Sequence, residues 1–212
     1  LDPNAVLATD LCIVGAGAAG ITLALQFVNS RTDVLLVESG GWSRQAETQD
    51  LYAGRVVSDL HPPADSFRCR QFGGSTTLWT GRCGPFDPID FERRDYVAHS
   101  GWPFGFDELE PYYRKANELC EAGEFAYSAA DPFPETPRPM VAGLESDHFC
   151  TNALERFSKP TNFADRYGPA LKAAPNVRVV LGGNATRFIF DDTGSRLAQM
   201  ALSDLGGKNV TV

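Results

Sequence analysis

The sequence is short of cysteine pairs, of positive charge and of long apolar runs, and each shortage excludes a class of protein. Its five cysteines, Cys12, Cys69, Cys83, Cys120 and Cys150, are odd in number and lack CxxC spacing, which excludes a disulfide framework and a zinc site. The net charge of −8 disfavours nucleic acid and anionic membranes as partners. No apolar run approaches the ~20 residues that span a bilayer, so we expect no membrane span.

The start of the chain and the cysteines bear on the cellular compartment. Leu1 to Thr9 have no basic segment followed by an apolar core, so they do not form a signal peptide. Unpaired cysteines indicate a reducing compartment, and we therefore expect a cytoplasmic protein. A periplasmic protein is expected instead if the natural N-terminus has been trimmed, because the chain begins with Leu rather than Met.

The most informative stretch, residues 10–38, has the order strand, glycine turn, helix, strand and acid. An apolar run stops at Gly15, and Gly15, Gly17 and Gly20 fit the pattern G-x-G-x-x-G. An apolar pattern of helical period follows, and a second apolar run ends in Glu38. Gly15 permits the tight turn, Gly17 lets a pyrophosphate approach the backbone, and Gly20 lets helix and strand pack closely.

The helix start and Glu38 of this stretch predict a dinucleotide site. The helix N-terminus presents unpaired N–H groups and a positive dipole end to phosphates. Glu38 can accept hydrogen bonds from both hydroxyls of a ribose, and it would repel a 2′-phosphate. The alternative interpretation, a glycine-rich turn in some other α/β protein, does not explain why the second strand ends in Glu38. The pattern alone leaves both NAD and FAD open as the cofactor.

A second glycine-rich stretch begins at Gly73. Residues 73–77 read Gly-Gly-Ser-Thr-Thr, which offers bare backbone and hydroxyls to a flat or phosphorylated ligand. The same residues, followed by Trp79, also fit a glycine-rich connector with a buried tryptophan. Both interpretations stay open for this stretch alone.

The rest of the chain predicts two helices and a set of strands. Asp107 and Glu110 have capping-box spacing at a helix start, and a short helix is expected from Pro169 to Ala174. Strands expected within residues 177–212 are separated by tight turns, which predicts a β-meander. Because the last strand ends with the chain, we expect the natural protein to continue.

Together these stretches resemble the glucose–methanol–choline (GMC) family of FAD-dependent oxidoreductases. The resemblance rests on VGAGAAG through VESGG, on GGSTTLWTGRC and on DPIDFERRDYVAHSGWPFGFDELEPYY, and it favours the sugar-oxidising branch of the family. It implies an α/β fold, with a Rossmann-like FAD-binding βαβ unit, a β-meander and part of a substrate-binding domain. Residues 1–100 would hold the first FAD-binding segments. Residues 101–160 would form a helical and loop excursion into a substrate or cap domain, and residues 161–212 would return to the FAD-binding domain.

The resemblance also implies which residues contact FAD. They come from the first glycine turn, the end of the second strand, the second glycine stretch and the start of the meander. These residues are Gly15, Gly17, Ala18 and Gly20 at the pyrophosphate, Glu38 and Ser39 at the adenosine ribose, Gly73, Gly74, Ser75, Thr76, Leu78, Trp79, Thr80 and Gly81 along the flavin, Arg82 and Cys83 directly after it, and Ala185 or Thr186 at the adenine.

Two departures from the family pattern carry further expectations. In the pyranose oxidase branch the flavin loop reads S-T-H-W and its His is bonded to FAD; here Leu78 stands at that position, so FAD should be noncovalent. The family's catalytic base is a His near the C-terminus, paired with Asn or another His. His61, His99 and His148 have no such context, so the catalytic residues stay unassigned and the pair is expected outside these 212 residues.

The resemblance implies oxidation of a CH–OH group of a sugar or glycoside, with hydride transfer to the flavin. The partners would be this small-molecule substrate and an electron-acceptor protein or partner subunit. One alternative is a truncated, catalytically silent flavin-binding module. Another is an NAD-dependent dehydrogenase, which leaves the stretch GGSTTLWTGRC without a role.

Overall fold

The computed structural model describes residues 6–57, 60–132, 141–144, 146, 149 and 151–212. The chain forms two compact units. The first consists of Leu1–Trp79 and Asn162–Val212, and the second of Thr80–Thr161. Residues 80–100, which the sequence analysis grouped with the first FAD-binding segments, are thus part of the second unit.

The first unit contains the expected βαβ element. Strand β1 (Leu11–Val14), helix α1 (Ala18–Leu25) and strand β2 (Val34–Glu38) follow one another, and β1 and β2 pair in parallel. All five residues of β2 are buried, as expected for a central strand of a parallel sheet. The sequence prediction for this element is confirmed.

The third strand of the parallel sheet comes from far along the chain. Strand β5 (Val177–Leu181) pairs in parallel with β2, which gives the order β1-β2-β5. The prediction that this strand belongs to the meander is therefore wrong. Gly182, with φ +73, turns the chain out of the parallel sheet directly after β5.

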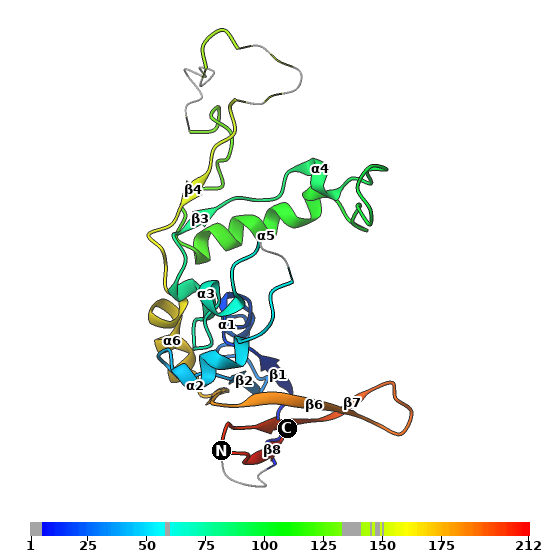
Figure 1. Cartoon of the computed structure of the whole chain (residues 1–212). Coiled ribbons are helices and arrows are strands. Elements are labelled where there is room, and N and C mark those ends of the chain that lie inside the picture. The colour runs from blue at the N-terminus through cyan, green and yellow to red at the C-terminus, as the bar shows by residue number, and fades with distance from the viewer. Residues whose placement is uncertain (1–5, 58–59, 133–140, 145, 147–148, 150) are drawn as a thin grey trace. The chain divides into compact units, whose positions relative to one another are not determined.

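The meander itself has three strands. These are β6 (Asn184–Phe190), β7 (Leu197–Ser203) and β8 (Asn209–Thr211), which pair antiparallel in chain order. Leu35 and Val37 of β2 form a buried cluster with Met200, Leu202 and Val210 of the meander. Figure 1 shows the meander on one side of the parallel sheet, and α1 with α6 (Phe163–Ala173) on the other.

Helix α6 begins earlier than the sequence predicted. The expected start was Pro169, but Asn162 caps the helix, since its Oδ1 accepts a hydrogen bond of 2.9 Å from the backbone N–H of Ala164. Such a cap satisfies one of the unpaired N–H groups of the first turn, and Pro169 is accommodated inside the helix. The helix ends at Ala173, as expected from the Pro that follows Ala174.

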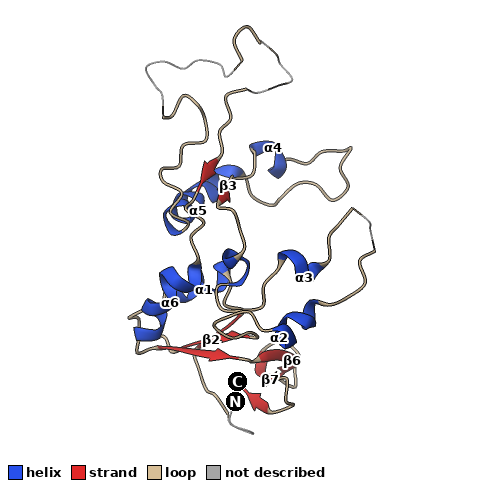
Figure 2. Ribbon diagram, turned by 60° about the vertical axis from the view of Figure 1, so that its left-hand side comes forward, coloured by secondary structure: helices blue, strands red, loops and turns tan. Residues whose placement is uncertain are grey.

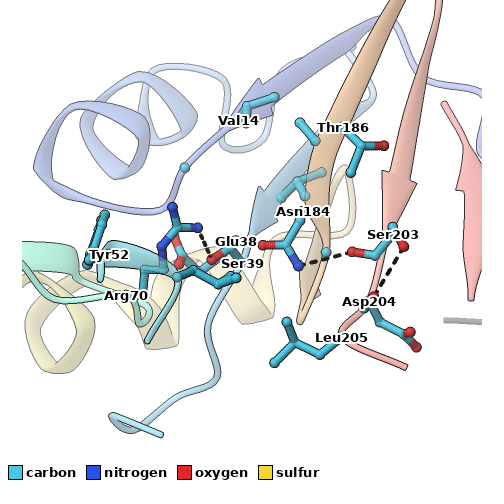
Figure 3. A pocket seen from close by; sticks show the side chains of 15 residues that line it. Val14, Glu38, Ser39, Tyr52, Arg70, Asn184, Thr186, Ser203, Asp204 and Leu205 are labelled. Atoms are coloured by element: carbon cyan, nitrogen blue, oxygen red, sulfur yellow. Dashed lines mark hydrogen bonds between the residues drawn. The ribbon is translucent and has the colours of Figure 1, made fainter. Parts of the chain in front are cut away.

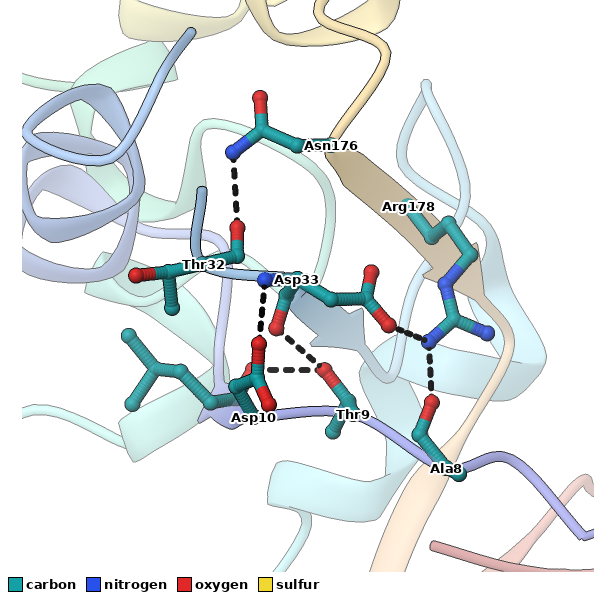
Figure 4. Close-up of polar contacts among 8 residues, drawn as sticks. Ala8, Thr9, Asp10, Thr32, Asp33, Asn176 and Arg178 are labelled. Atoms are coloured by element: carbon teal, nitrogen blue, oxygen red, sulfur yellow. Dashed lines mark hydrogen bonds and ion pairs between the residues drawn. The ribbon is translucent and has the colours of Figure 1, made fainter. Parts of the chain in front are cut away.

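Polar contacts tie together the amino ends of the three parallel strands (Figure 4). The Asp33 carbonyl accepts a 2.7 Å bond from Thr9 Oγ1, and the Asp33 carboxylate pairs with Arg178 at 2.8 Å. Asn176 Nδ2 donates to the carbonyl of Thr32 at 2.8 Å. These contacts set the strands in register at the end opposite to the glycine turn.

Short helices occupy the excursion that follows β2 (Figure 2). They are α2 (Ala46–Gln49), η1 (Asp50–Tyr52) and α3 (Ala64–Phe67), and a further turn, η2 (Gly74–Thr77), lies in the second glycine stretch. Gln49 is 4% exposed, and its side-chain amide donates to the backbone of Asp65 and Arg68 and accepts from Arg70 N. The excursion is therefore anchored by one buried amide.

The second unit has a small antiparallel ribbon and two helices. Strand β3 (Arg82–Cys83) pairs with β4 (Arg156–Phe157), and the helices are α4 (Pro88–Phe91) and α5 (Phe106–Leu119). Asp107 does not cap α5, because the helix begins one residue before it with Gly105 as its N-cap. The capping box lies instead at α4, between Asp87 and Asp90.

None of the helices in the described part of the chain combines the length and apolar character that crossing a bilayer requires.

Candidate dinucleotide-binding site

The first glycine turn lies between the carboxyl end of β1 and the start of α1. Gly15 has φ +96, a conformation that favours glycine, and its N–H donates to Val37 O at 2.7 Å. A Cβ on Gly20 would lie 1.8 Å from Gly15 O, so only glycine permits the helix to pack this close to the turn. Gly17 is the N-cap of α1 with extended backbone.

The second glycine stretch lies against this turn. Gly73 N donates to Ala16 O at 2.7 Å, and a Cβ on Gly74, which has φ +54, would lie 2.9 Å from the Cα of Gly17. Thr76 Oγ1 donates to Gly73 O at 2.6 Å and accepts from Phe163 N. The Thr76 hydroxyl thus holds the loop in shape, and the two glycine stretches make backbone-to-backbone contact.

A cavity of about 550 Å³ opens where the two stretches meet. Most of its lining residues were expected at the cofactor. The lining consists of Val14, Gly15, Gly17, Ala18, Ala19, Gly20, Ser75, Thr76 and Trp79. The structure therefore brings the α1 N-terminus and the hydroxyl-bearing loop to one place, where the helix dipole and unpaired N–H groups favour an anion.

Glu38 sits at the carboxyl end of β2, 7% exposed. Its Oε2 accepts from Ala16 N at 2.8 Å and its Oε1 from Gly40 N at 2.9 Å. A carboxylate offers about four lone-pair sites, so each oxygen keeps capacity for a ligand hydroxyl. The carboxylate both fixes the glycine turn and remains able to accept from a ribose.

A second cavity of about 580 Å³ lies beside Glu38 (Figure 3). The residues predicted at the adenosine, namely Glu38, Ser39, Ala185 and Thr186, line it together with Gly15, which was predicted at the pyrophosphate. Val14 and Gly15 line both cavities, so the two lie next to each other at the glycine turn.

Sequence reasoning missed several residues of this second cavity. They come from the excursion after β2 and from the meander: Leu51, Tyr52, Arg70, Asn184, Ser203, Asp204 and Leu205. Arg70 Nη1 donates to Ser39 Oγ at 2.8 Å and its guanidinium lies 4.4 Å from the Tyr52 ring centroid. A sequence signal existed, since Arg70 precedes the second glycine stretch and Asn184 follows Gly182-Gly183.

Two residues that line this cavity carry a buried polar atom without a hydrogen-bond partner. Within the described part of the chain, three buried side-chain N or O atoms lack a hydrogen-bond partner, and two of them, Arg70 Nε and Asn184 Oδ1, belong to residues lining it. An unsatisfied buried group costs about 1–3 kcal/mol. A ligand that accepts from Arg70 and donates to Asn184 would remove this cost, as a nucleoside with ribose oxygens and an amino group can.

The remaining candidate residues do not line these two cavities. Leu78 is 45% exposed. Gly73 and Gly74 contact the first glycine turn but line neither cavity. Thr80, Gly81, Arg82 and Cys83 belong to the second unit, where Gly81 O accepts from Ser158 N at 2.8 Å and from Cys83, and Arg82 pairs with Glu155. For Thr80, Gly81, Arg82 and Cys83 a cofactor contact stays a prediction.

The histidines do not line the two cavities within the described residues. His61 packs edge-on against Phe67, with ring centroids 5.1 Å apart, and His99 stands in a turn with φ +58. His148 and Cys150 lie outside the residues that the structure describes.

Curated relatives match part of the chain, whereas no protein-family profile matches it. The 6'''-hydroxyparomomycin C oxidase of Streptomyces lividus is 31% identical over 49% of this chain and 21% of that protein. The paromamine 6'-oxidase of Streptomyces fradiae is 27% identical over 58% and 26%. The fructose dehydrogenase large subunit of Gluconobacter japonicus is 25% identical over 64% and 31%.

Solved structures show the same fold. Pyridoxine 4-oxidase from Mesorbium loti superposes with a TM-score of 0.59 at 19% identity, covering 97% of this chain and 48% of that one. Formate oxidase gives 0.57 at 18% identity, covering 100% and 44%. The chain thus spans less than half of these relatives. The likeness confirms the expected α/β fold.

Proposed function

Since this chain is related to the glucose–methanol–choline (GMC) family of flavoprotein oxidoreductases, we propose that its first unit holds one FAD molecule along the two adjacent cavities. The adenosine occupies the cavity beside Glu38, and the pyrophosphate lies against Gly15, Gly17 and Gly20. The observation that carries this proposal is that two residues lining the cavity beside Glu38 have a buried polar atom without a hydrogen-bond partner, namely Arg70 Nε and Asn184 Oδ1.

The proposed reaction is oxidation of a CH–OH group of a small molecule. FAD, when bound, supplies the acceptor for the hydride. The residues of this chain bind and orient it: Glu38 accepts from the ribose, Arg70 donates to it, and the α1 N-terminus stabilises the pyrophosphate charge. Names of curated relatives include fructose dehydrogenase and paromamine 6'-oxidase, which supports a sugar or glycoside as the substrate class.

Oxidation of the alcohol also requires a base that accepts the hydroxyl proton. Neither His61 nor His99 lines the two cavities, so we propose that deprotonation depends on a residue other than these two. General base catalysis contributes about 10²–10⁴-fold, and a chain without such a base would bind flavin with little turnover. The curated relatives include both oxidases and a dehydrogenase subunit, which keeps oxygen and an acceptor protein as candidate electron acceptors.

Ligand discrimination tests the proposed cofactor. We expect titration of the flavin-free chain to give tight binding of FAD, weaker binding of ADP and no measurable binding of FMN. The reason is that FMN has no adenosine to occupy the cavity beside Glu38. NAD would compete poorly with FAD. Preferential binding of NAD would refute the flavin site, and preferential binding of FMN would refute the adenosine assignment.

The flavin is expected to be noncovalent, because leucine at position 78 cannot bond to it. Formate oxidase of Aspergillus oryzae RIB40 has been studied for FAD modification, so the attachment requires a direct test. Acid precipitation should release all yellow colour into the supernatant. Flavin fluorescence that stays with the denatured polypeptide would contradict this expectation.

Replacing Arg70 by methionine should weaken FAD binding by about tenfold or more, since a hydrogen bond from a charged group is worth about 1.5–3 kcal/mol. Methionine keeps the apolar stem of the side chain. The matched control is Arg68→Met, because Arg68 does not line the cavity and stacks on Phe67 instead. Flavin fluorescence titration measures both variants, and equal affinity in the two would remove Arg70 from the site.

A further inference from the structure

Two cysteine thiols meet inside the second unit. Cys83 is the last residue of β3, and Cys120 follows the last residue of α5. Both are partly buried and carry no disulfide, and the Cys83 thiol lies close enough to Cys120 to contribute to the raised pKa of the Cys120 thiol. Figure 1 shows β3 beside α5, which explains how residues so far apart in sequence become neighbours.

The backbone around both cysteines is fixed by one buried pair, Ser158 and Thr161, which are 6% and 4% exposed. Gly81 O accepts from Ser158 N at 2.8 Å and from Cys83 Sγ at 3.4 Å. Thr161 Oγ1 lies 3.1 Å from Ser158 Oγ and donates to Cys120 O at 3.0 Å. The same buried pair therefore holds the two backbone segments that carry the thiols.

The environment of Cys120 keeps its thiol protonated. Burial, followed by the neighbouring Cys83 thiol, raises the pKa of Cys120 to about 11. The thiolate is the nucleophile in thiol oxidation, so Cys120 is almost entirely protonated at neutral pH. Cys83 is then the thiol that an oxidant meets first, and Cys120 is the resolving partner.

We propose that Cys83 and Cys120 form a reversible dithiol–disulfide pair that hydrogen peroxide oxidises. The Cys83 thiolate attacks a peroxide oxygen, the O–O bond breaks, and a sulfenic acid forms as one water is released after protonation. The Cys120 sulfur then loses its proton and displaces the hydroxyl as a second water, which leaves the S–S bond. Two thiols lose two electrons and two protons in total, and one peroxide becomes two waters.

The disulfide would join the ribbon to the end of α5. Because a cross-link restricts the unfolded chain, the oxidised second unit should resist unfolding more than the reduced one. The proposal does not rest on flavin binding, since all of its residues and contacts belong to the second unit.

Peptide mapping of the folded full-length chain tests the proposal. The reduced protein is treated with stoichiometric hydrogen peroxide, alkylated with N-ethylmaleimide and digested without reductant. We expect two alkylated thiols fewer than in the untreated protein, a cross-linked peptide containing Cys83 and Cys120, and recovery of both thiols with dithiothreitol. Cys83→Ser and Cys120→Ser should each abolish the cross-link, and Cys12→Ser, the matched control in the first unit, should leave it intact.

Peptide mapping of the wild-type protein can also give results that contradict the proposal. Persistent alkylation of both cysteines, irreversible oxidation of Cys83 alone, or a cross-link that pairs either cysteine with a different partner would overturn the proposal. A further comparison uses protein unfolded in urea before the peroxide is added. If the Cys83–Cys120 cross-link formed equally well there, the folded contact would not be its cause.

Discussion

Replacing Gly17 by valine is expected to abolish FAD binding while the chain stays folded. Gly17 has φ −80 and extended ψ, which any residue adopts, and a Cβ there would meet only the Cα of Gly74, at 4.0 Å. The added side chain therefore has room in the flavin-free protein. It would occupy the place where the pyrophosphate must approach the backbone.

The loss should be large. Displacing the pyrophosphate from the α1 N-terminus should raise the Kd for FAD by at least ~100-fold, or about 2.7 kcal/mol. Fluorescence titration measures the affinity, and circular dichroism verifies the fold. Gly84→Val is the matched control, because a Cβ at Gly84 meets nothing within 4 Å and this residue lines neither cavity. Full flavin content in the Gly17 variant would place the cofactor elsewhere.

Replacing Gly20 by alanine, three residues further on, is expected to prevent folding of the first unit. The added Cβ would lie 1.8 Å from Gly15 O and 3.0 Å from its carbonyl carbon. Both atoms belong to the backbone, so relief requires α1 to move away from β1. We expect a loss of more than about 4 kcal/mol, which is comparable with the whole stability of a typical domain.

The matched control is Gly168→Ala in α6, also at a helical glycine. Its Cβ would meet Phe72 Cε1 at 3.4 Å and Trp42 Cζ3 at 3.7 Å, which are ordinary contacts, and alanine favours a helix over glycine by about 1 kcal/mol. Thermal unfolding and the yield of soluble protein separate the two variants. A Gly20→Ala chain with wild-type Tm would mean that helix and turn are not packed as described.

Local patterns were sufficient to predict the βαβ element. Its glycines, its apolar runs and Glu38 lie within 29 consecutive residues, from Asp10 to Glu38, and every contact that the pattern requires is made by neighbours in sequence. The predicted start of α6 is too late because Pro169 is also a suitable first helical residue, whereas the helix is capped by Asn162. The correct prediction of the βαβ element and the wrong start of α6 thus both depend on residues close in sequence.

The features that the sequence does not predict depend on tertiary contacts. Val177–Leu181 is an apolar run that suits either kind of sheet, and only its pairing with β2 assigns it to the parallel one. Tyr52 and Arg70 of the excursion line the cavity beside Glu38, and Gln49 accepts a hydrogen bond from the backbone N–H of Arg70. No periodicity in the sequence predicts these contacts. The proposed thiol pair depends likewise on how β3 and α5 pack.

The first unit is assembled from two separated parts of the chain, which has a consequence during synthesis on the ribosome. β2 lacks its neighbour on one side until β5 has been translated, and the second glycine stretch lacks Phe163, whose N–H binds Thr76. Asn176 then donates to Phe27 O. Closing so long a loop costs entropy, and the unpaired strand is meanwhile exposed to aggregation. On the proposed function, the nascent protein acquires FAD only after the residues that complete the sheet have emerged, so that flavin capture reports a completed first unit.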